Sequence, residues 1–124
     1  MSDPAPKCKC TIIKNIVLLL ILCLASALVW HNLNERSLRL KENRALELMN
    51  EGQNKAAIQK FLEVKQERPK AEDQARLNAY LADCYVNLAE DPGIPFEESL
   101  KYYRKVQEFD PGKVPALIRE RLKQ

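Results

Sequence analysis

The chain has 124 residues, a length that allows one small domain with accessory segments. Its formal net charge is only +3, and residues 32–124 carry 17 basic and 16 acidic side chains. A body so close to neutral argues against nucleic-acid binding as its main role.

An apolar segment near the amino terminus is the first recognisable element. Residues 12–30 contain a single charge, Lys14, and form a helix of about 28 Å. That length suffices to cross a hydrocarbon core of about 30 Å, with Lys14, Trp30 and His31 at the membrane interfaces. We therefore expect three regions: a disordered basic leader over 1–11, a transmembrane helix over 12–31 and a helical domain over 32–124.

Other interpretations of this segment stay open. Ala25, Ser26 and Ala27 form an A-x-A pattern, which also fits the cleaved signal peptide of an exported soluble protein. We expect Cys8 and Cys10 to be incidental thiols; acylation, or metal binding with ligands from elsewhere, is the alternative. Basic residues on the two flanks nearly balance. The expected orientation, amino terminus in the cytoplasm and body on the extracytoplasmic (periplasmic) side, follows only from the short basic leader.

The rest of the chain has the pattern of a helical domain. Helices are predicted over residues 38–51, 54–67, 72–89, 96–109 and 115–123. A turn at Gly52, a break at Pro69, a loop over 90–95 and a break at 110–112 separate them. Residues 12–51 contain neither glycine nor proline, so the anchor should run unbroken into the first helix. No run of alternating β-branched residues occurs, and the predicted fold class is all-α.

One spacing occurs twice in this domain. Ala57, Ile58, Phe61, Val64 and Pro69 return 42 residues later as Ser99, Leu100, Tyr103, Val106 and Pro111. In each copy a small, an aromatic and an aliphatic residue share one helical face. The self-similarity predicts two stacked helical hairpins.

Helix pairs with this spacing resemble tetratricopeptide repeats, which have a 34-residue unit. The family's first-helix positions are matched by Ala45 and Leu48 in one copy and by Leu81, Ala82 and Tyr85 in the other. The match covers residues 38–111, with eight extra residues per period and with Lys41 and Arg44 at positions that are usually apolar. We interpret Val114–Gln124, with its stripe of Leu117, Ile118 and Leu122, as a cap over the open end.

In this family the concave face of the first helices binds partner proteins. By position, the resemblance implies a groove lined by Arg39, Glu42, Leu46, Met49, Asn50, Arg76, Ala79, Asp83, Val86 and Asn87. The alternative is a solvated or oligomer-packed surface. A carboxylate clamp for chaperone tails is not expected, because Glu42 and Leu46 stand where that clamp needs Lys and Asn.

Several single residues have ordinary structural interpretations. Cys84 should be a buried small hydrophobe, and His31 an interfacial side chain. The basic tail residues Lys113, Arg119, Arg121 and Lys123 form a solvated face or touch anionic lipid.

Nothing in the sequence assembles a catalytic set. It has no Ser–His pair and no glycine-rich phosphate loop. We expect no enzyme activity, cofactor, metal or small-molecule substrate. The expected function is that of a membrane-anchored scaffold, which binds protein partners and helps assemble a membrane complex. A structural subunit built permanently into such a complex is the alternative, because two repeats make a small core.

Overall fold

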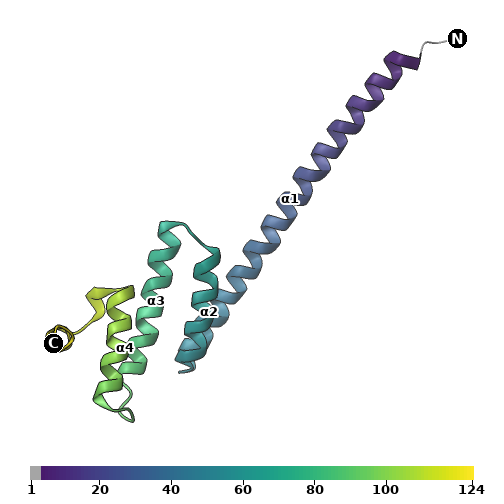
Figure 1. Cartoon of the computed structure of the whole chain (residues 1–124). Helices are drawn as coiled ribbons and strands as arrows, with labels where there is room; N and C mark the ends of the chain where they lie inside the picture. The colour runs from purple at the N-terminus through teal and green to yellow at the C-terminus, as the bar shows by residue number, and fades with distance from the viewer. Residues whose placement is uncertain (1–3) are drawn as a thin grey trace. The chain divides into compact units, whose positions relative to one another are not determined.

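The computed structural model describes residues 4–124, with side-chain surroundings from residue 9 onward. Its elements are α1 (Pro4–Asn50), α2 (Asn54–Glu67), α3 (Ala71–Ala89), α4 (Phe96–Phe109), the 3₁₀ turn η1 (Pro111–Lys113) and α5 (Ala116–Leu122) (Figure 1). No strand occurs over residues 4–124, which confirms the all-α prediction. From Gly52 onward, every predicted helix end lies within one residue of the observed end.

Helix α1 begins earlier than the sequence suggested. Residues 4–11 are helical, where a disordered leader was expected, and residues 1–3 lie outside the described residues. Pro4 and Pro6 do not prevent this, because the first turn of a helix has no intrahelical partner for the missing N–H groups. After Pro6 no helix breaker occurs before Gly52, and α1 continues past Trp30 as predicted.

The chain divides into two compact units, Met1–Ser37 and Leu38–Gln124. The boundary lies within α1, six residues beyond the predicted domain start. Its position follows from burial: Leu33 is 59% exposed, whereas Leu38 is 2% exposed and is the first side chain of α1 to be enclosed.

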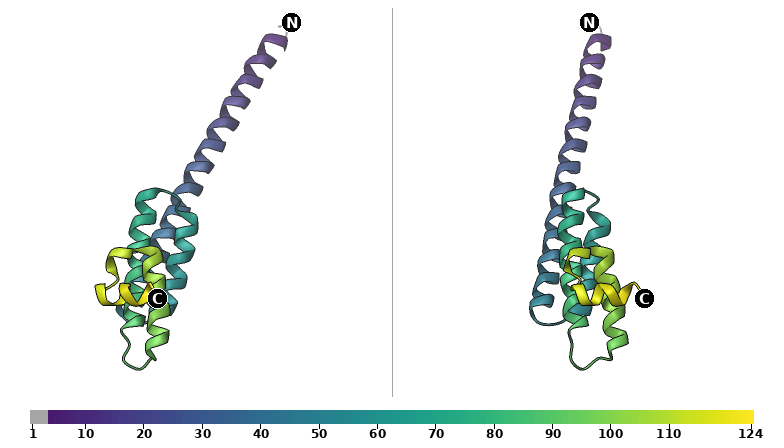
Figure 2. Two further views of the ribbon diagram at one scale, coloured as in Figure 1. Left: turned by 60° about the vertical axis from the view of Figure 1, so that its left-hand side comes forward. Right: turned by 90° about the vertical axis from the view of Figure 1, so that its left-hand side faces the viewer.

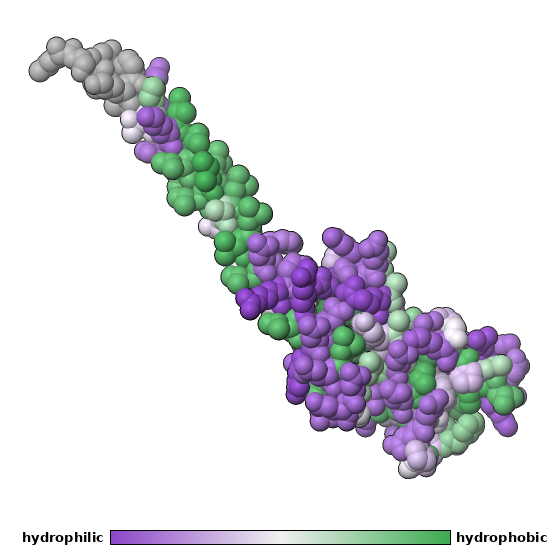
Figure 3. Space-filling model, turned by 180° about the vertical axis from the view of Figure 1, so that it is seen from behind, coloured by the Kyte–Doolittle hydropathy of each residue, from purple (hydrophilic) through white to green (hydrophobic). Residues whose placement is uncertain are grey.

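The first unit exposes its apolar side chains. The large aliphatic residues from Ile12 to Val29 are 47–65% exposed, and Trp30 is 75% exposed. Figure 3 shows hydrophobic side chains along the whole of this stretch. By length and composition α1 can cross a membrane, and a signal sequence near the amino terminus meets the same criteria.

A glycine turn ends α1 and starts the second unit's first hairpin. Gly52 has a φ of 81°, a left-handed conformation that costs glycine nothing. The N–H of Gly52 donates to Met49 O at 3.1 Å and that of Gln53 to Leu48 O at 2.8 Å. These two bonds form a Schellman motif, which satisfies carbonyls at the helix end.

The core of the second unit consists of two clusters on either side of α3, which packs against α2 and α4 (Figure 2). The first cluster contains Ala45, Leu48, Ala57, Ile58, Phe61, Val64, Leu77, Leu81 and Cys84. The second contains Ala82, Ala89, Tyr103, Val106 and Val114. Most of the repeated positions lie in the core: Phe61 and Val106 are fully buried and Tyr103 is 6% exposed, whereas Pro69 and Pro111 are exposed.

The carboxyl-terminal segment covers the second cluster only in part. Val114 is 2% exposed, and Ile118 and Leu122 pack against the same cluster. Leu117, which was expected to share that stripe, is 84% exposed. Residues i and i+1 of a helix lie about 100° apart, so a seven-residue α5 that buries Ile118 turns Leu117 outward. Helix α5 lies across α4 rather than along it (Figure 2).

Candidate partner-binding site

The residues predicted to line a groove lie on α1 and α3 and differ in exposure. Three are exposed: Arg39, Asn50 and Asn87. Six are half-buried: Leu46, Met49, Arg76, Ala79, Asp83 and Val86. One, Glu42, is only 8% exposed. The second unit brings α1 and α3 together through an ion pair rather than leaving an open channel between them.

That ion pair joins Glu42 of α1 to Arg76 of α3. The guanidinium donates from Nε to Glu42 Oε1 at 2.7 Å and from Nη2 to Glu42 Oε2 at 3.2 Å. A third bond runs from Nη1 to Asp73 Oδ1 at 2.8 Å. Hydrogen bonding to Glu42, more than to Asp73, raises the pKa of Arg76 above its usual range. Charges paired in this way already have hydrogen-bond partners, so few of their donors and acceptors remain for a partner protein.

A second intramolecular contact occupies the middle of α3. Lys113 of η1 extends its ammonium group to Asp83 Oδ1 at 2.5 Å and to the Ala79 carbonyl at 3.2 Å. Two of the predicted groove positions, Ala79 and Asp83, therefore contact the chain's own turn, although the Asp83 side chain is still 46% exposed. Lys113 belongs to this contact, not to the solvated basic face assigned to the tail.

The remaining groove positions form a narrower surface. Asn87 donates to Asn54 Oδ1 at 3.2 Å, which ties α3 to the start of α2. Leu46 and Met49 pack against the first core cluster and Val86 against the second, each with one side still accessible. What is left for a partner is a mixed strip of half-buried apolar side chains, bordered by Asn50 and Asn87.

Sequence reasoning missed three residues that shape this face: Asp73, Asn54 and Lys113. One signal for Lys113 was available, since it follows Ala71, the first residue of α3, by 42 residues, the period of this chain's own repeat. It therefore stands where a third first helix would begin. Asp73 and Asn54 carried no such signal, because their contacts depend on how α1, α2 and α3 approach one another.

Gln74 was not singled out either, and it links α2 to α3. Its side-chain amide donates to Lys65 O at 2.8 Å and to Arg68 O at 2.7 Å. Carbonyls in the last turn of a helix lack intrahelical partners, so the amide fills that need. The two hydrogen bonds thereby link the start of α3 to the end of α2.

An aromatic cluster lies where α2, α3 and α4 meet. Tyr85 stacks on Phe109 with centroids 5.9 Å apart and lies 6.3 Å from Tyr102. The ammonium of Lys65 sits 4.8 Å from the centre of the Phe109 ring. Burial raises the pKa of the Tyr85 hydroxyl. The cluster joins the two hairpins and presents no reactive group.

The chemistry of the described side chains is that of a packed helical surface. Cys84 is fully buried, as predicted, and burial raises the pKa of its thiol to about 11. A protonated, enclosed thiol is a poor nucleophile. Among the described side chains, no group of three His, Cys, Asp or Glu residues is placed to hold a metal ion.

The predicted interfacial residues Lys14, Trp30 and His31 are all exposed on α1. A shallow apolar groove on the same part of the helix is lined by Leu22, Ala25, Ser26, Val29, Trp30 and Leu33. Ala25 and Ser26 are the two small residues of this lining, between longer side chains on the same helix.

Compared with models of protein families, with curated proteins and with solved structures, the chain matches none of them. Its likeness to tetratricopeptide repeats therefore rests on the residues themselves and on the spacing that they share.

Proposed function

We propose that this protein is a membrane-anchored docking protein, which binds protein partners and helps assemble a membrane-associated complex. One observation carries the proposal: α1 contains an apolar segment of which no part is buried, and the same helix continues into a separately packed helical unit. Exposed apolar side chains in that number are costly in water and favourable in lipid.

The second unit supports a binding role more than a catalytic one. The face of this unit seen in Figure 3 is largely hydrophilic, and its core consists of two clusters of buried side chains. Stacked helical hairpins of the tetratricopeptide type present a face on which other chains dock. In this chain that face is the strip of Leu46, Met49, Asn50, Val86 and Asn87, with its central charges already paired.

A permanent structural subunit is the second candidate function. Single apolar side chains remain exposed on the second unit: Leu40 at 61%, Phe96 at 56% and Leu117 at 84%. They lie on three different helices, α1, α4 and α5. A subunit surrounded by neighbours would cover all of them, whereas a docking protein would use one face.

Site-specific photo-crosslinking of the full chain in its native membrane tests the proposal. A benzoylphenylalanine is placed at Asn50 or Asn87 on the candidate face, and at Lys101 or Arg104 on α4 as matched exposed controls. Docking predicts discrete adducts from the first two positions and none from the controls. Adducts from all four positions would support the structural subunit. No adduct from any position would contradict both.

Membrane anchoring is tested separately by alkaline extraction and by intact-mass measurement. A chain that stays in the membrane fraction with residues 1–31 present supports the anchor. A chain that begins near Leu28 would show that the segment is a cleaved signal peptide.

A further inference from the structure

Four basic residues follow the apolar segment within fourteen residues: Arg36, Arg39, Lys41 and Arg44. The structure separates them into two kinds. Lys41 lies 4.0 Å from Glu67, and Arg44 forms an ion pair with Glu47 at 3.0 Å. Arg36 and Arg39 are exposed and have no carboxylate partner among the described side chains, and the nearby Glu42 is occupied by Arg76. Two cations in this stretch thus remain available.

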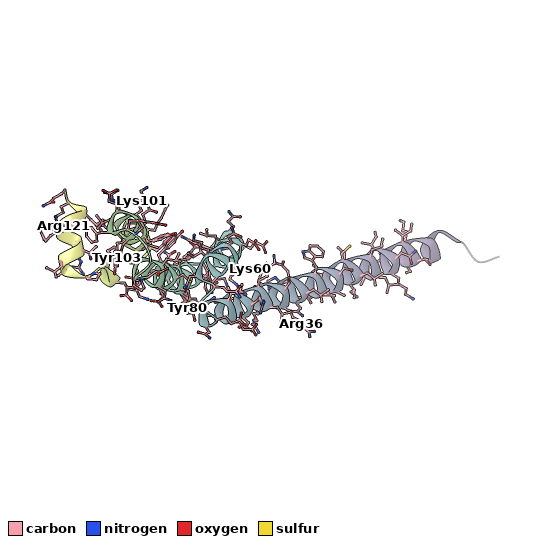
Figure 4. All side chains as sticks on the ribbon, turned by 90° about the horizontal axis from the view of Figure 1, so that it is seen from below. Arg36, Lys60, Tyr80, Lys101, Tyr103 and Arg121 are labelled. Atoms are coloured by element: carbon pink, nitrogen blue, oxygen red, sulfur yellow. The ribbon has the colours of Figure 1, made fainter. Side chains whose placement is uncertain are left out.

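The position of the available arginines along α1 suits a membrane surface. Arg36 follows Trp30 by six residues, or about 9 Å of helix. A tryptophan at this place sits at headgroup level, and the headgroup layer adds roughly 5–7 Å beyond the hydrocarbon core. Side chains in a helix lean toward its amino-terminal end, which for Arg36 and Arg39 is the direction of the apolar segment. Figure 4 shows the side chain of Arg36 projecting from α1.

We propose that Arg36 and Arg39 bind the phosphate groups of anionic lipids in the leaflet that the carboxyl-terminal end of the apolar segment reaches. A guanidinium presents several N–H donors in a plane and binds phosphate oxygens through two of them at once. Each basic residue held near such a surface contributes about 1 kcal/mol to binding, or about fivefold in affinity for an anionic over a neutral surface. The proposal rests on the membrane anchoring stated above and adds the class of lipid that the anchor selects.

The test uses the full chain and its only tryptophan, Trp30, which lies six residues from Arg36. The protein is reconstituted in vesicles of equal phosphatidylcholine and phosphatidylglycerol, in which one or the other lipid carries brominated acyl chains that quench tryptophan fluorescence. Enrichment predicts that brominated phosphatidylglycerol quenches Trp30 at least about twofold more than brominated phosphatidylcholine. Raising the salt concentration should reduce the difference, because exposed charges are screened.

Two double variants decide whether the arginines are responsible. Arg36→Gln with Arg39→Gln should bring the quenching ratio to about one. Lys41→Gln with Arg44→Gln removes the same charge farther from the apolar segment and should lower the ratio less, because those cations have carboxylate partners and lie further along α1. Equal quenching by the two lipids in the unmodified chain would overturn the inference, as would equal losses in the two variants.

The outcome is distinct from that of the proposed function. If the chain fails to float with vesicles of either composition, the anchor itself is refuted. If it floats, shows no preference for phosphatidylglycerol, and loses a partner crosslink on Arg36→Gln with Arg39→Gln, the arginines bind an acidic protein segment and the lipid inference is wrong.

Discussion

Replacing Arg76 with methionine should destabilise the second unit more than replacing its partner Glu42 with glutamine. The asymmetry follows from exposure: the Glu42 side chain is 10% exposed and the Arg76 side chain 39%. Without Arg76 a carboxylate remains nearly enclosed without its cation. Without the Glu42 charge, Arg76 still has Asp73 and water.

The magnitudes can be worked from these contacts. Breaking a buried ion pair by removing one partner costs about 3–5 kcal/mol. Because more than a third of Arg76 is exposed, solvent screening reduces this to about 2 kcal/mol for Arg76→Met. Glu42→Gln retains a carbonyl acceptor and should cost about 1 kcal/mol. In a unit of this size, 1 kcal/mol shifts Tm by about 4–8 °C.

The assay is thermal unfolding of the full chain in mild detergent, followed by far-UV circular dichroism. Arg44→Met is the matched control, because Arg44 pairs with Glu47 in an exposed contact that should contribute less than about 0.5 kcal/mol. A Tm for Arg76→Met equal to or above that of Arg44→Met would refute the reasoning. So would a larger loss for Glu42→Gln than for Arg76→Met.

Three further outcomes are expected. Gly52→Ala should lower the free energy of unfolding by about 1–2 kcal/mol in the same melt, because φ at this position is 81°. The open surroundings of Gly52 add no steric clash to this cost. An unchanged stability would contradict the left-handed turn. Leu117→Ala should change Tm by under about 2 °C, whereas Ile118→Ala should lower it by several degrees, because only Ile118 packs on the core. Similar losses in the two variants would show that α5 packs through a different face. The pKa of Cys84 is raised to about 11 from an ordinary 9.0, so the unfolded chain loses the thiol proton first. The difference in free energy of unfolding between the protein and Cys84→Ala should therefore be constant below pH 9 and fall by about 2 kcal/mol by pH 11. A difference that does not change across that range would refute the burial argument.

Much of the local structure was predictable from residue type. Gly52, Pro69, Pro95 and Pro111 are backbone constraints that act within a few residues, so the breaks between helices followed from them directly. The repeated spacing identified Phe61 and Tyr103 as core residues, because a helical face is set by sequence separation alone. The unexpected helix over residues 4–11 shows the limit of the same reasoning, since proline opposes a helix only beyond its first turn.

The face proposed for partner binding was less accessible to sequence reasoning. Position within a repeat placed Glu42, Arg76 and Asp83 on one surface. It did not indicate which of these charges would be neutralised by an ion pair. Glu42 and Arg76 are 34 residues apart, and Asp83 and Lys113 are 30 apart. Such pairs form only when whole helices approach, and their geometry depends on the packing of Phe61, Leu81 and their neighbours.

By itself, the sequence determined an apolar helix near the amino terminus, an all-helical body and the core residues that share the repeated spacing, because hydrophobic periodicity and backbone breakers act locally. Only the tertiary structure decided that the packed unit begins at Leu38, that Leu117 points outward, and that Arg36 and Arg39 remain unpaired while Lys41 and Arg44 do not. The physical reason is that burial and charge pairing are properties of distances between elements, and those distances are set by the side chains of several helices packing at once.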